Sequence, residues 1–348
     1  MSATVAQDAI LKELAALWTQ EGKLGDAGVL RACSMTLVVL AEESDDPSAL
    51  GETIAALMPE HPARAVLIRL RGAGERELTE RVYQQCWKPF GQRQQICCEQ
   101  IELTASDAAL ADLPSVVLPL AVPDLPVILW CRSARLMRMA EFCEIAKMAT
   151  KVVLDSGETY GEAGAQAGDC AGAMGRMMDV LRCGTLVGDL AWTRLTRWRE
   201  MLARVFEDRA HLAKLPEISG VRVSFAAGFE TAAWYMGAWV ANALGDAGVQ
   251  PKVQVMRSDA TPSLQVSLAG GDFGVQLERR DDRLTIGVDI AVKSVTHCTN
   301  LPPPSDYLLM REELGIIRRD PVFERTLASA ARLAVSSPEP SSGHSSEP

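Results

Sequence analysis

The segment Asp189-Leu-Ala-Trp-Thr-Arg-Leu-Thr-Arg-Trp-Arg-Glu-Met-Leu-Ala-Arg-Val-Phe206 organises the sequence. Its large apolar residues recur at spacings of three, four and seven positions, which is typical of one helix face: Leu195, Trp198, Leu202, Val205 and Phe206. Gly188-Asp189 provides a helix start, because an Asp carboxylate accepts hydrogen bonds from the first unpaired backbone N–H groups. The pattern predicts one amphipathic helix from 189 to 206, with these charged residues in solvent: Arg194, Arg197, Glu200 and Arg204.

Arg199 does not follow this pattern. It lies seven residues from both Trp192 and Phe206, so it points toward the apolar side of the predicted helix. A guanidinium group keeps its charge, and a buried one therefore requires a carboxylate, several carbonyl groups or an anionic ligand. We expect Asp124 or Asp155 to pair with Arg199. The other interpretation is a core helix whose arginine reaches solvent at the rim.

Residues 189–199, read as Asp-Leu-x-Trp-x-Arg-Leu-x-x-Trp-Arg, resemble the signature of the OpcA family, the glucose-6-phosphate dehydrogenase assembly proteins. Three other segments resemble the family in the same order: His61-Pro-Ala-Arg64, Pro123-Asp-Leu-Pro-Val-Ile-Leu-Trp130 and Val153-Leu-Asp-Ser156. The last third of the chain resembles it only in general pattern. The resemblance implies a partner protein that binds glucose-6-phosphate dehydrogenase and promotes its active oligomer, supporting the oxidative pentose phosphate pathway.

Length and composition limit the classes of protein. A chain of 348 residues can form two lobes, and its 48% hydrophobic and 23% charged residues are ordinary for a globular protein. The net charge of −10 argues against electrostatic binding to nucleic acid or to an anionic membrane. Prolines interrupt the most apolar stretch, residues 115–131, so we expect two buried strands there and not a membrane helix. With no secretory signal pattern visible and nine cysteines that fit free thiols, we expect a cytoplasmic location.

The predicted fold class is α/β, with α+β character in the C-terminal half. Apolar runs at 35–40 and 65–70 flank a helix, which predicts a mixed sheet flanked by helices. A hairpin over 78–103 and a helix over 135–148 complete this lobe. The second lobe is expected to contain a strand at 221–225, a helix from 230 to 244, an antiparallel meander over 253–290 and two closing helices. The expected division is an N-terminal domain (1–184), the signature helix connecting the lobes (185–214), a C-terminal domain (215–335) and a disordered tail (336–348).

No catalytic, cofactor or metal site is expected. The four histidines are widely separated and form no zinc motif. Gly72-Ala-Gly74 begins like a dinucleotide fingerprint, but its third position is Glu77 where a glycine is required. No phosphate-binding loop of the Gly-x-x-x-x-Gly-Lys type occurs.

Several polar residues remain as candidates, some of them just beyond predicted strands: His61, Arg64, Asp124, Arg132, Asp155, Ser156, Asp189, Arg194 and Arg199. With Trp130, Trp192 and Trp198, they are the family-signature residues, in either a structural or a partner-binding role. They favour an internal ion-pair network, and the alternative is a sugar-phosphate-binding enzyme or sensor in which arginines bind phosphate and tryptophans stack on the sugar. The candidate docking surfaces are the cationic face of the signature helix (Arg194, Arg197, Arg204) and the exposed edge of the meander.

Overall fold

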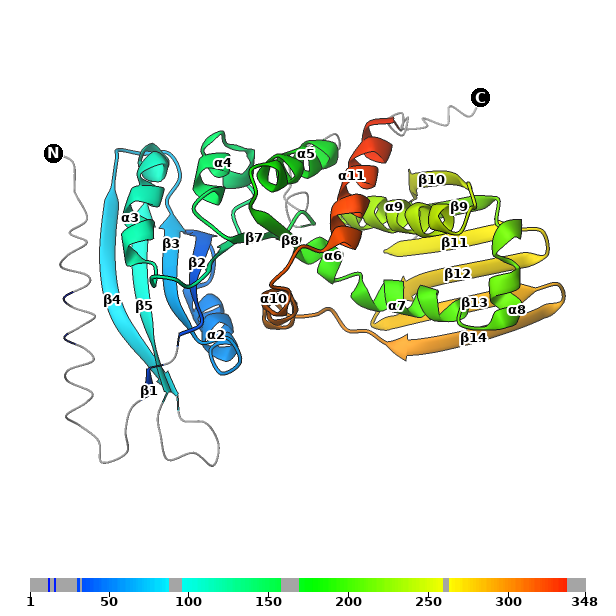
Figure 1. The fold of residues 1–348 in the computed structure, drawn as a ribbon, viewed down its shortest axis with the longest axis horizontal. Coiled ribbons are helices and arrows are strands. Elements are labelled where there is room, and N and C mark those ends of the chain that lie inside the picture. Colours follow the sequence, from blue (N-terminus) through cyan, green and yellow to red (C-terminus); the bar gives the residue numbers. More distant parts are fainter. Residues whose placement is uncertain are drawn as a thin grey trace, which may run out of the picture. The chain divides into compact units, whose positions relative to one another are not determined.

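The computed structural model describes residues 12, 16, 30–31, 33–87, 96–157, 169–258 and 263–336. The chain forms two compact units, each assembled from separate segments of the sequence (Figure 1). Unit 1 comprises Met1–Asp155, Asp179–Asp189 and Ser305–Arg318, and unit 2 comprises Ser156–Met178, Leu190–Pro304 and Arg319–Pro348. The domain boundaries expected at residues 184 and 215 remain predictions. The helix predicted over Ala6–Leu17 and the C-terminal tail lie almost wholly outside the described residues.

Unit 1 contains an eight-stranded sheet with the order β1-β5-β3-β2-β6-β7-β8, and β4 pairs with β5. Pairing is parallel from β5 through β8, while β4 is antiparallel to β5. Numbered along the chain, the parallel strands from β2 onward follow the order 3-2-1-4-5-6 of doubly wound folds. The strands are β1 (Leu30–Arg31), β2 (Met35–Glu42), β3 (Ala63–Leu70), β4 (Leu78–Trp87), β5 (Ile96–Ala105), β6 (Val127–Cys131), β7 (Lys151–Leu154) and β8 (Leu186–Asp189).

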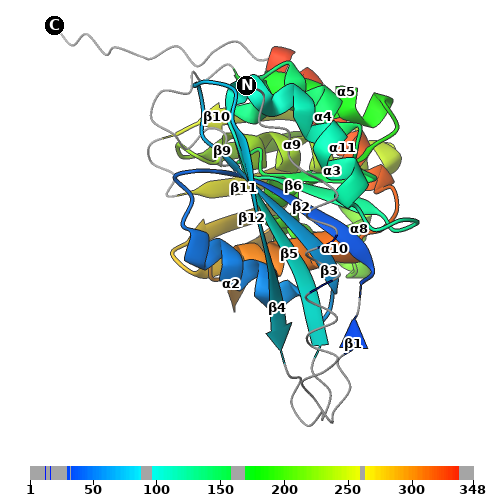
Figure 2. The ribbon, with the colours of Figure 1, turned by 90° about the vertical axis from the view of Figure 1, so that its left-hand side faces the viewer.

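Helices cover both faces of this sheet, as Figure 2 shows with α2 on one side and α3 and α4 on the other. The helical segments are α2 (Pro47–Leu57), η1 (Asp107–Asp112), α3 (Leu113–Leu120), η2 (Leu136–Arg138), α4 (Glu141–Ala146) and α10 (Asp306–Gly315). Coverage on both faces explains the continuous apolar sequence of β2, in which only Glu42 is not buried. Helix α2 begins at Pro47, with Asp46 as its N-cap. Helix α5 (Asp169–Arg182) has residues in both units.

Unit 2 contains a six-stranded sheet with the order β10-β9-β11-β12-β13-β14. All neighbouring pairs are antiparallel except β10 with β9, so the predicted antiparallel sheet has one parallel pair. The strands are β9 (Gly220–Phe225), β10 (Lys252–Arg257), β11 (Leu264–Gly270), β12 (Phe273–Arg280), β13 (Arg283–Ile290) and β14 (Lys293–Asn300). The helical segments are α6 (Leu190–Thr193), α7 (Thr196–Val205), α8 (Arg209–Ala213), η4 (Leu215–Glu217), α9 (Glu230–Asp246) and α11 (Pro321–Ser336). Both units together confirm the predicted α/β class with a second sheet-containing lobe.

One face of the unit 2 sheet is apolar and covered by helices. The register places one row of side chains on this face: Val223, Val266, Leu277 and Ile286. Helix α9 packs at one end of the row, where a Cβ added at Gly237 would lie 3.7 Å from Val223. Helix α7 packs on β13 at the other end. Helices α7 and α9 therefore share one sheet face.

The single helix predicted from 189 to 206 is wrong. Asp189 ends strand β8, where it pairs with Leu154, and the next residue, Leu190, begins helix α6. The helical part divides into α6 and α7 at Leu195, whose φ of −90° and ψ of 0° interrupt the α-helix. The apolar spacing describes α7 correctly, but it carries no signal for the pairing of residues 186–189 with a distant strand.

Two other segments also differ from prediction. Residues 113–120, part of the stretch predicted as two strands, form helix α3. Its buried residues have helical spacing and are Leu113, Val116, Val117 and Leu120. The helix predicted over 135–148 is two short segments, because Met139 between them is extended with φ −83° and ψ 153°. Across the described ranges, no helix has both the length and the apolar character needed to cross a membrane.

Candidate functional site

Three candidate residues lie at the carboxyl ends of neighbouring parallel strands of unit 1. Arg132 follows β6, Asp155 follows β7, and Asp189 ends β8. The Asp155 side chain is buried, and Asp189 is 0% exposed. Doubly wound folds usually bind their ligands at the carboxyl edge of the sheet, so this edge is the first candidate for a site.

Three other candidates lie at the opposite edge of the sheet. His61 precedes β3, Arg64 is near its start, and Asp124 is in the loop before β6. Arg64 is buried and forms an ion pair with Glu99, and its Nη1 donates to the Leu120 carbonyl at 2.7 Å. Asp124 is exposed, with a φ of 63° that Asp tolerates in turns. The structure therefore does not bring His61, Arg64 and Asp124 together with the residues at the carboxyl edge.

The strand order reverses between β2 and β6, and a network of ion pairs occupies the carboxyl edge at this point. Arg132 pairs with Asp306 and lies 3.7 Å from Asp45, while its guanidinium is 5.0 Å from the Trp130 ring centroid. Arg135 donates to Asp107 at 2.5 Å and to Glu42 at 3.1 Å. These hydrogen bonds raise the pKa of Arg135 above its usual value, so its guanidinium group stays positively charged.

Doubly wound folds of this strand order commonly bind dinucleotides at the switch point. Here the loop after β2, residues 43–46, contains Glu43, Asp45 and Asp46 and no glycine. The first amides of α2 would have to bind a pyrophosphate, but Asp46 already accepts a hydrogen bond from the Ser48 amide at 2.9 Å. Carboxylates repel phosphate groups, so the residues present do not fit a dinucleotide.

In unit 2, the signature segment forms an aromatic cluster. The Trp192 ring is 5.8 Å from both Tyr235 and Phe323, measured between centroids. The Arg199 guanidinium lies 3.5 Å from the Trp192 ring centroid, and its Nη1 donates to the Trp192 carbonyl at 2.7 Å. Trp198 is buried on the same segment. Trp192 and Arg199 thus take part in the packing of unit 2, while the role of the signature residues as a set and the pairing of Arg199 with Asp124 or Asp155 stay predictions.

Two remaining candidates also lie in unit 2. The Ser156 carbonyl accepts a hydrogen bond from the Thr231 hydroxyl at 3.2 Å, and its side chain is buried. Arg194 follows α6 and is half-buried. Neither residue is on the surface of the groove described next.

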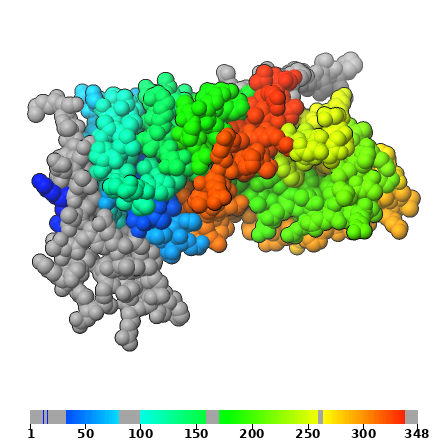
Figure 3. Space-filling model, in the orientation of Figure 1, coloured from blue at the N-terminus to red at the C-terminus, as the bar shows by residue number. Residues whose placement is uncertain are grey.

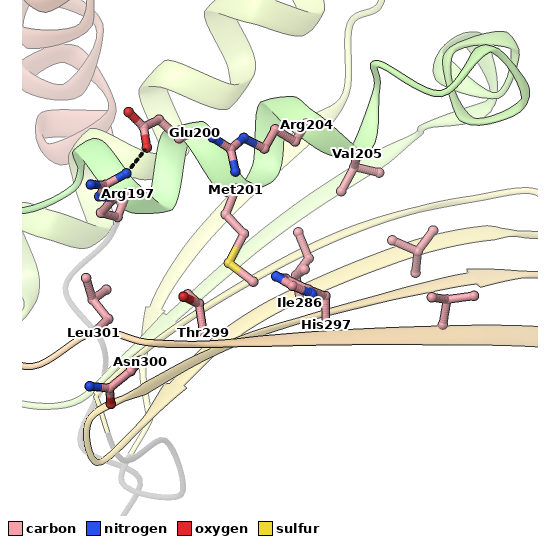
Figure 4. A pocket seen from close by; sticks show the side chains of 12 residues that line it. Arg197, Glu200, Met201, Arg204, Val205, Ile286, His297, Thr299, Asn300 and Leu301 are labelled. Carbon is pink, nitrogen blue, oxygen red and sulfur yellow. Dashed lines mark hydrogen bonds and ion pairs between the residues drawn. The ribbon is translucent and has the colours of Figure 1, made fainter.

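A groove with a volume of about 520 Å³ lies between α7 and the β13–β14 hairpin. Figure 4 shows Met201 pointing from α7 toward the hairpin, with His297 and Thr299 pointing back toward the helix. Arg197 and Glu200, at the rim, form an ion pair at 2.9 Å. In the space-filling view of Figure 3, the α7–α8 segment (green) lies on the surface of unit 2 above the hairpin segment (orange). Arg197 and Arg204 of the predicted cationic face therefore border one groove together with the exposed edge of the meander, whereas Arg194 does not.

Several residues of these sites did not stand out in the sequence. They are Glu42, Asp45, Asp107, Arg135, Met201, His297 and Asp306. Glu42 carries a weak signal, because it directly follows the apolar run of a strand, and Arg135 carries a weaker one, four residues beyond the end of another such run at Cys131. Asp306 has none, because its contact with Arg132 joins segments 174 residues apart.

The fold and the sites define a class: a two-unit α/β protein whose doubly wound sheet has its phosphate-binding position filled by its own carboxylates. Residues 54–169 match the family model for the N-terminal domain of a glucose-6-phosphate dehydrogenase subunit, and residues 185–327 match the model for its C-terminal domain. The chain belongs to this family, the OpcA family of glucose-6-phosphate dehydrogenase assembly proteins.

Curated relatives carry the name OxPP cycle protein OpcA. The chain is 25% identical to the protein from Synechococcus elongatus over 276 residues, which are 75% of this chain and 57% of that protein. It is 26% identical to the protein from Nostoc punctiforme over 149 residues, 43% of this chain and 30% of that protein. The chain thus matches at most a little over half the length of these relatives. Among solved structures, Gal80p from Saccharomyces cerevisiae aligns with a TM-score of 0.45 and 8% identity, over 86% of this chain and 94% of that one.

Proposed function

We propose that this protein is a non-catalytic partner of glucose-6-phosphate dehydrogenase that promotes the enzyme's active oligomeric assembly in the oxidative pentose phosphate pathway. The observation that carries the proposal is the match of residues 54–169 and 185–327 to the two domains of a family described as a subunit of that enzyme. The name of the curated relatives, OxPP cycle protein, supports the same pathway.

The switch point of unit 1 supports a non-catalytic role. A dehydrogenase on this fold would need the position after β2 for its dinucleotide, and here Asp46 caps α2 while Asp45 lies beside Arg132. The chain is thereby suited to act through binding. A partner that binds the active assembly more tightly than the inactive one shifts the equilibrium toward the active form by mass action.

The alternative is a sugar-phosphate-binding enzyme or sensor that uses the strand-end cluster. It has less support, because Arg132 at that edge already pairs with Asp306, and Arg135 beside it pairs with Glu42 and Asp107. A charged phosphate would have to displace these carboxylates. Binding of glucose 6-phosphate to the isolated protein would support the alternative, and a thermal-shift titration measures it directly.

Co-purification with glucose-6-phosphate dehydrogenase from the same organism tests the proposal. We expect the tagged chain to retain the enzyme on an affinity column and the two proteins to elute together in gel filtration. Separate elution of the two pure proteins at micromolar concentration would contradict it.

A further inference from the structure

Strand β14 is an open sheet edge. Within the described residues it pairs only with β13, and all eight of its residues are exposed. Val295 in its first half is 68% exposed, and Val292 in the preceding turn is 99% exposed. The unpaired backbone groups of such a strand are a template for another strand.

Proteins usually protect sheet edges with charges, prolines or bulges, and β14 has little of this protection. Its sequence, Lys293-Ser-Val-Thr-His-Cys-Thr-Asn300, contains one charged residue, at the end next to the turn, and no proline. Its register with β13 is continuous over eight residue pairs, without a bulge. The edge is therefore suited to pair with an extended segment over much of its length.

The groove beside this edge would accept side chains from such a segment. Its floor, formed by the β13–β14 hairpin, includes the apolar residues Ile286, Val288 and Val295, and Val205 lines the groove from α7. His297 lies opposite Ile286 in the register, so its side chain is on the same face as the floor. An extended segment on β14 would direct every second side chain to this face, where an apolar residue would be buried beneath Met201.

The charged residues at the rim of the groove indicate that the bound segment also carries a carboxylate. Arg197 is neutralised by Glu200, but Arg204 is exposed and, in the ranges that the structure describes, has no ion-pair partner. The opposing carboxylate would come from the segment itself. A second copy of this chain fits less well, because two copies with a net charge of −10 repel each other and both would present Arg204 at the same site.

We propose that the groove between α7 and β14 binds an extended segment of glucose-6-phosphate dehydrogenase. The segment adds a strand to β14, places an apolar side chain in the groove and pairs a carboxylate with Arg204. This inference rests on the proposed function and assigns it a surface.

Two substitutions test it without touching the buried core. Arg204→Glu reverses the rim charge, and Val295→Asp places a carboxylate over the apolar floor. Arg209→Glu on α8 and Val335→Asp on α11 are matched controls, because both residues are exposed and lie outside the groove. We expect each groove variant to raise the Kd for the dehydrogenase at least about tenfold, and each control to leave it within about twofold. Thermal unfolding of all four variants verifies that they are folded.

Hydrogen exchange of the complex distinguishes strand addition from other docking modes. We expect the amides of residues 293–300 to exchange more slowly when the dehydrogenase is bound, because the added strand covers them. If the wild-type protein binds but the groove variants bind equally tightly, or if these amides are unchanged, the surface is wrong and the proposed function stands. If the wild-type protein does not bind, the proposed function fails. A dimer of the chain alone that Val295→Asp dissociates would overturn the inference in favour of a second copy.

Discussion

The Lys151 ammonium group and the Glu313 carboxylate form a buried ion pair at 2.7 Å, although they are 162 residues apart in the sequence. Lys151 lies at the start of β7 and Glu313 is in α10. Lys151 Nζ also donates to the Glu313 carbonyl at 2.7 Å and to the Ile316 carbonyl at 3.1 Å. One lysine thus satisfies three acceptors and attaches α10 to the sheet of unit 1.

Removing the lysine should destabilise unit 1 strongly. Lys151→Met leaves the Glu313 carboxylate buried without its cation, which typically costs about 3 kcal/mol or more. Urea unfolding measures this loss. The double variant Lys151→Met with Glu313→Leu should recover much of it, because it buries no unpaired charge. A loss below about 1 kcal/mol in the single variant would contradict the assigned role.

Gly188 is required for the close approach of α10 to β8. A Cβ at this position would lie 2.1 Å from Oε2 of Glu313 and 3.0 Å from Cε of Lys151. We expect Gly188→Ala to reduce stability by about 1–3 kcal/mol through overpacking and displacement of the ion pair. Gly175→Ala in α5 is the control, because its Cβ meets nothing within 4 Å and Ala favours a helix. Equal melting temperatures for the two variants would contradict this packing.

Arg199 should stabilise unit 2 through its planar group. The guanidinium lies over the Trp192 ring and donates hydrogen bonds to the Trp192 carbonyl and the Thr196 hydroxyl. Arg199→Lys keeps the charge but loses the stacking and the forked geometry, so we expect a loss of about 1 kcal/mol. Arg199→Met removes the cation as well and should cost more. Arg197→Lys on the exposed face is the control, with an expected change below about 0.5 kcal/mol. An unchanged or higher melting temperature of Arg199→Met would contradict the stabilising role.

The Cys131 thiol should be unreactive in the folded protein. Burial raises its pKa to about 12, so the thiolate fraction at pH 8 is on the order of one in ten thousand. Alkylation at pH 8 followed by peptide mass spectrometry should label the exposed Cys183 and Cys298 and leave Cys131 unlabelled. Equal labelling of Cys131 in the native protein would contradict its burial.

The raised pKa of Cys131 also makes the free energy of unfolding depend on pH. Because the folded pKa of Cys131 lies above the value of about 8.5 in an unfolded chain, the unfolded state loses this proton first. The contribution of Cys131 is present below a pH of about 8.5 and declines as the pH rises toward 12. Cys131→Ala should show a smaller alkaline decline in the free energy of unfolding than the wild type. An identical decline would mean that this thiol does not contribute.

Local sequence patterns correctly predicted the elements whose structure is set by their own residues. The continuous apolar runs at 35–40 and 65–70 are strands β2 and β3, and the hairpin predicted over 78–103 is β4 and β5. The helix expected at 230–244 is α9, two residues longer. In each case one segment's composition and its immediate neighbours are sufficient to set its structure.

The features that the local sequence did not indicate depend on contacts between residues far apart in the chain. The local context Gly188-Asp189 indicates a helix start, and α6 does begin at Leu190, but nothing local shows that Asp189 also ends strand β8 and pairs with Leu154. Of the candidate residues, Arg132, Asp155 and Asp189 do share one edge, as parallel strands require. The partners Asp306 and Glu313 come from a helix that joins unit 1 from far along the chain.

We propose that the protein acts on glucose-6-phosphate dehydrogenase by binding and not by chemistry of its own. The most direct measurement titrates the purified chain into the dehydrogenase and follows KM, kcat and the mass of the assembly by light scattering. We predict saturable activation that parallels the appearance of a heavier complex containing both proteins. Unchanged kinetics and mass at saturating concentration, or turnover of a sugar phosphate by the chain alone, would contradict the claim.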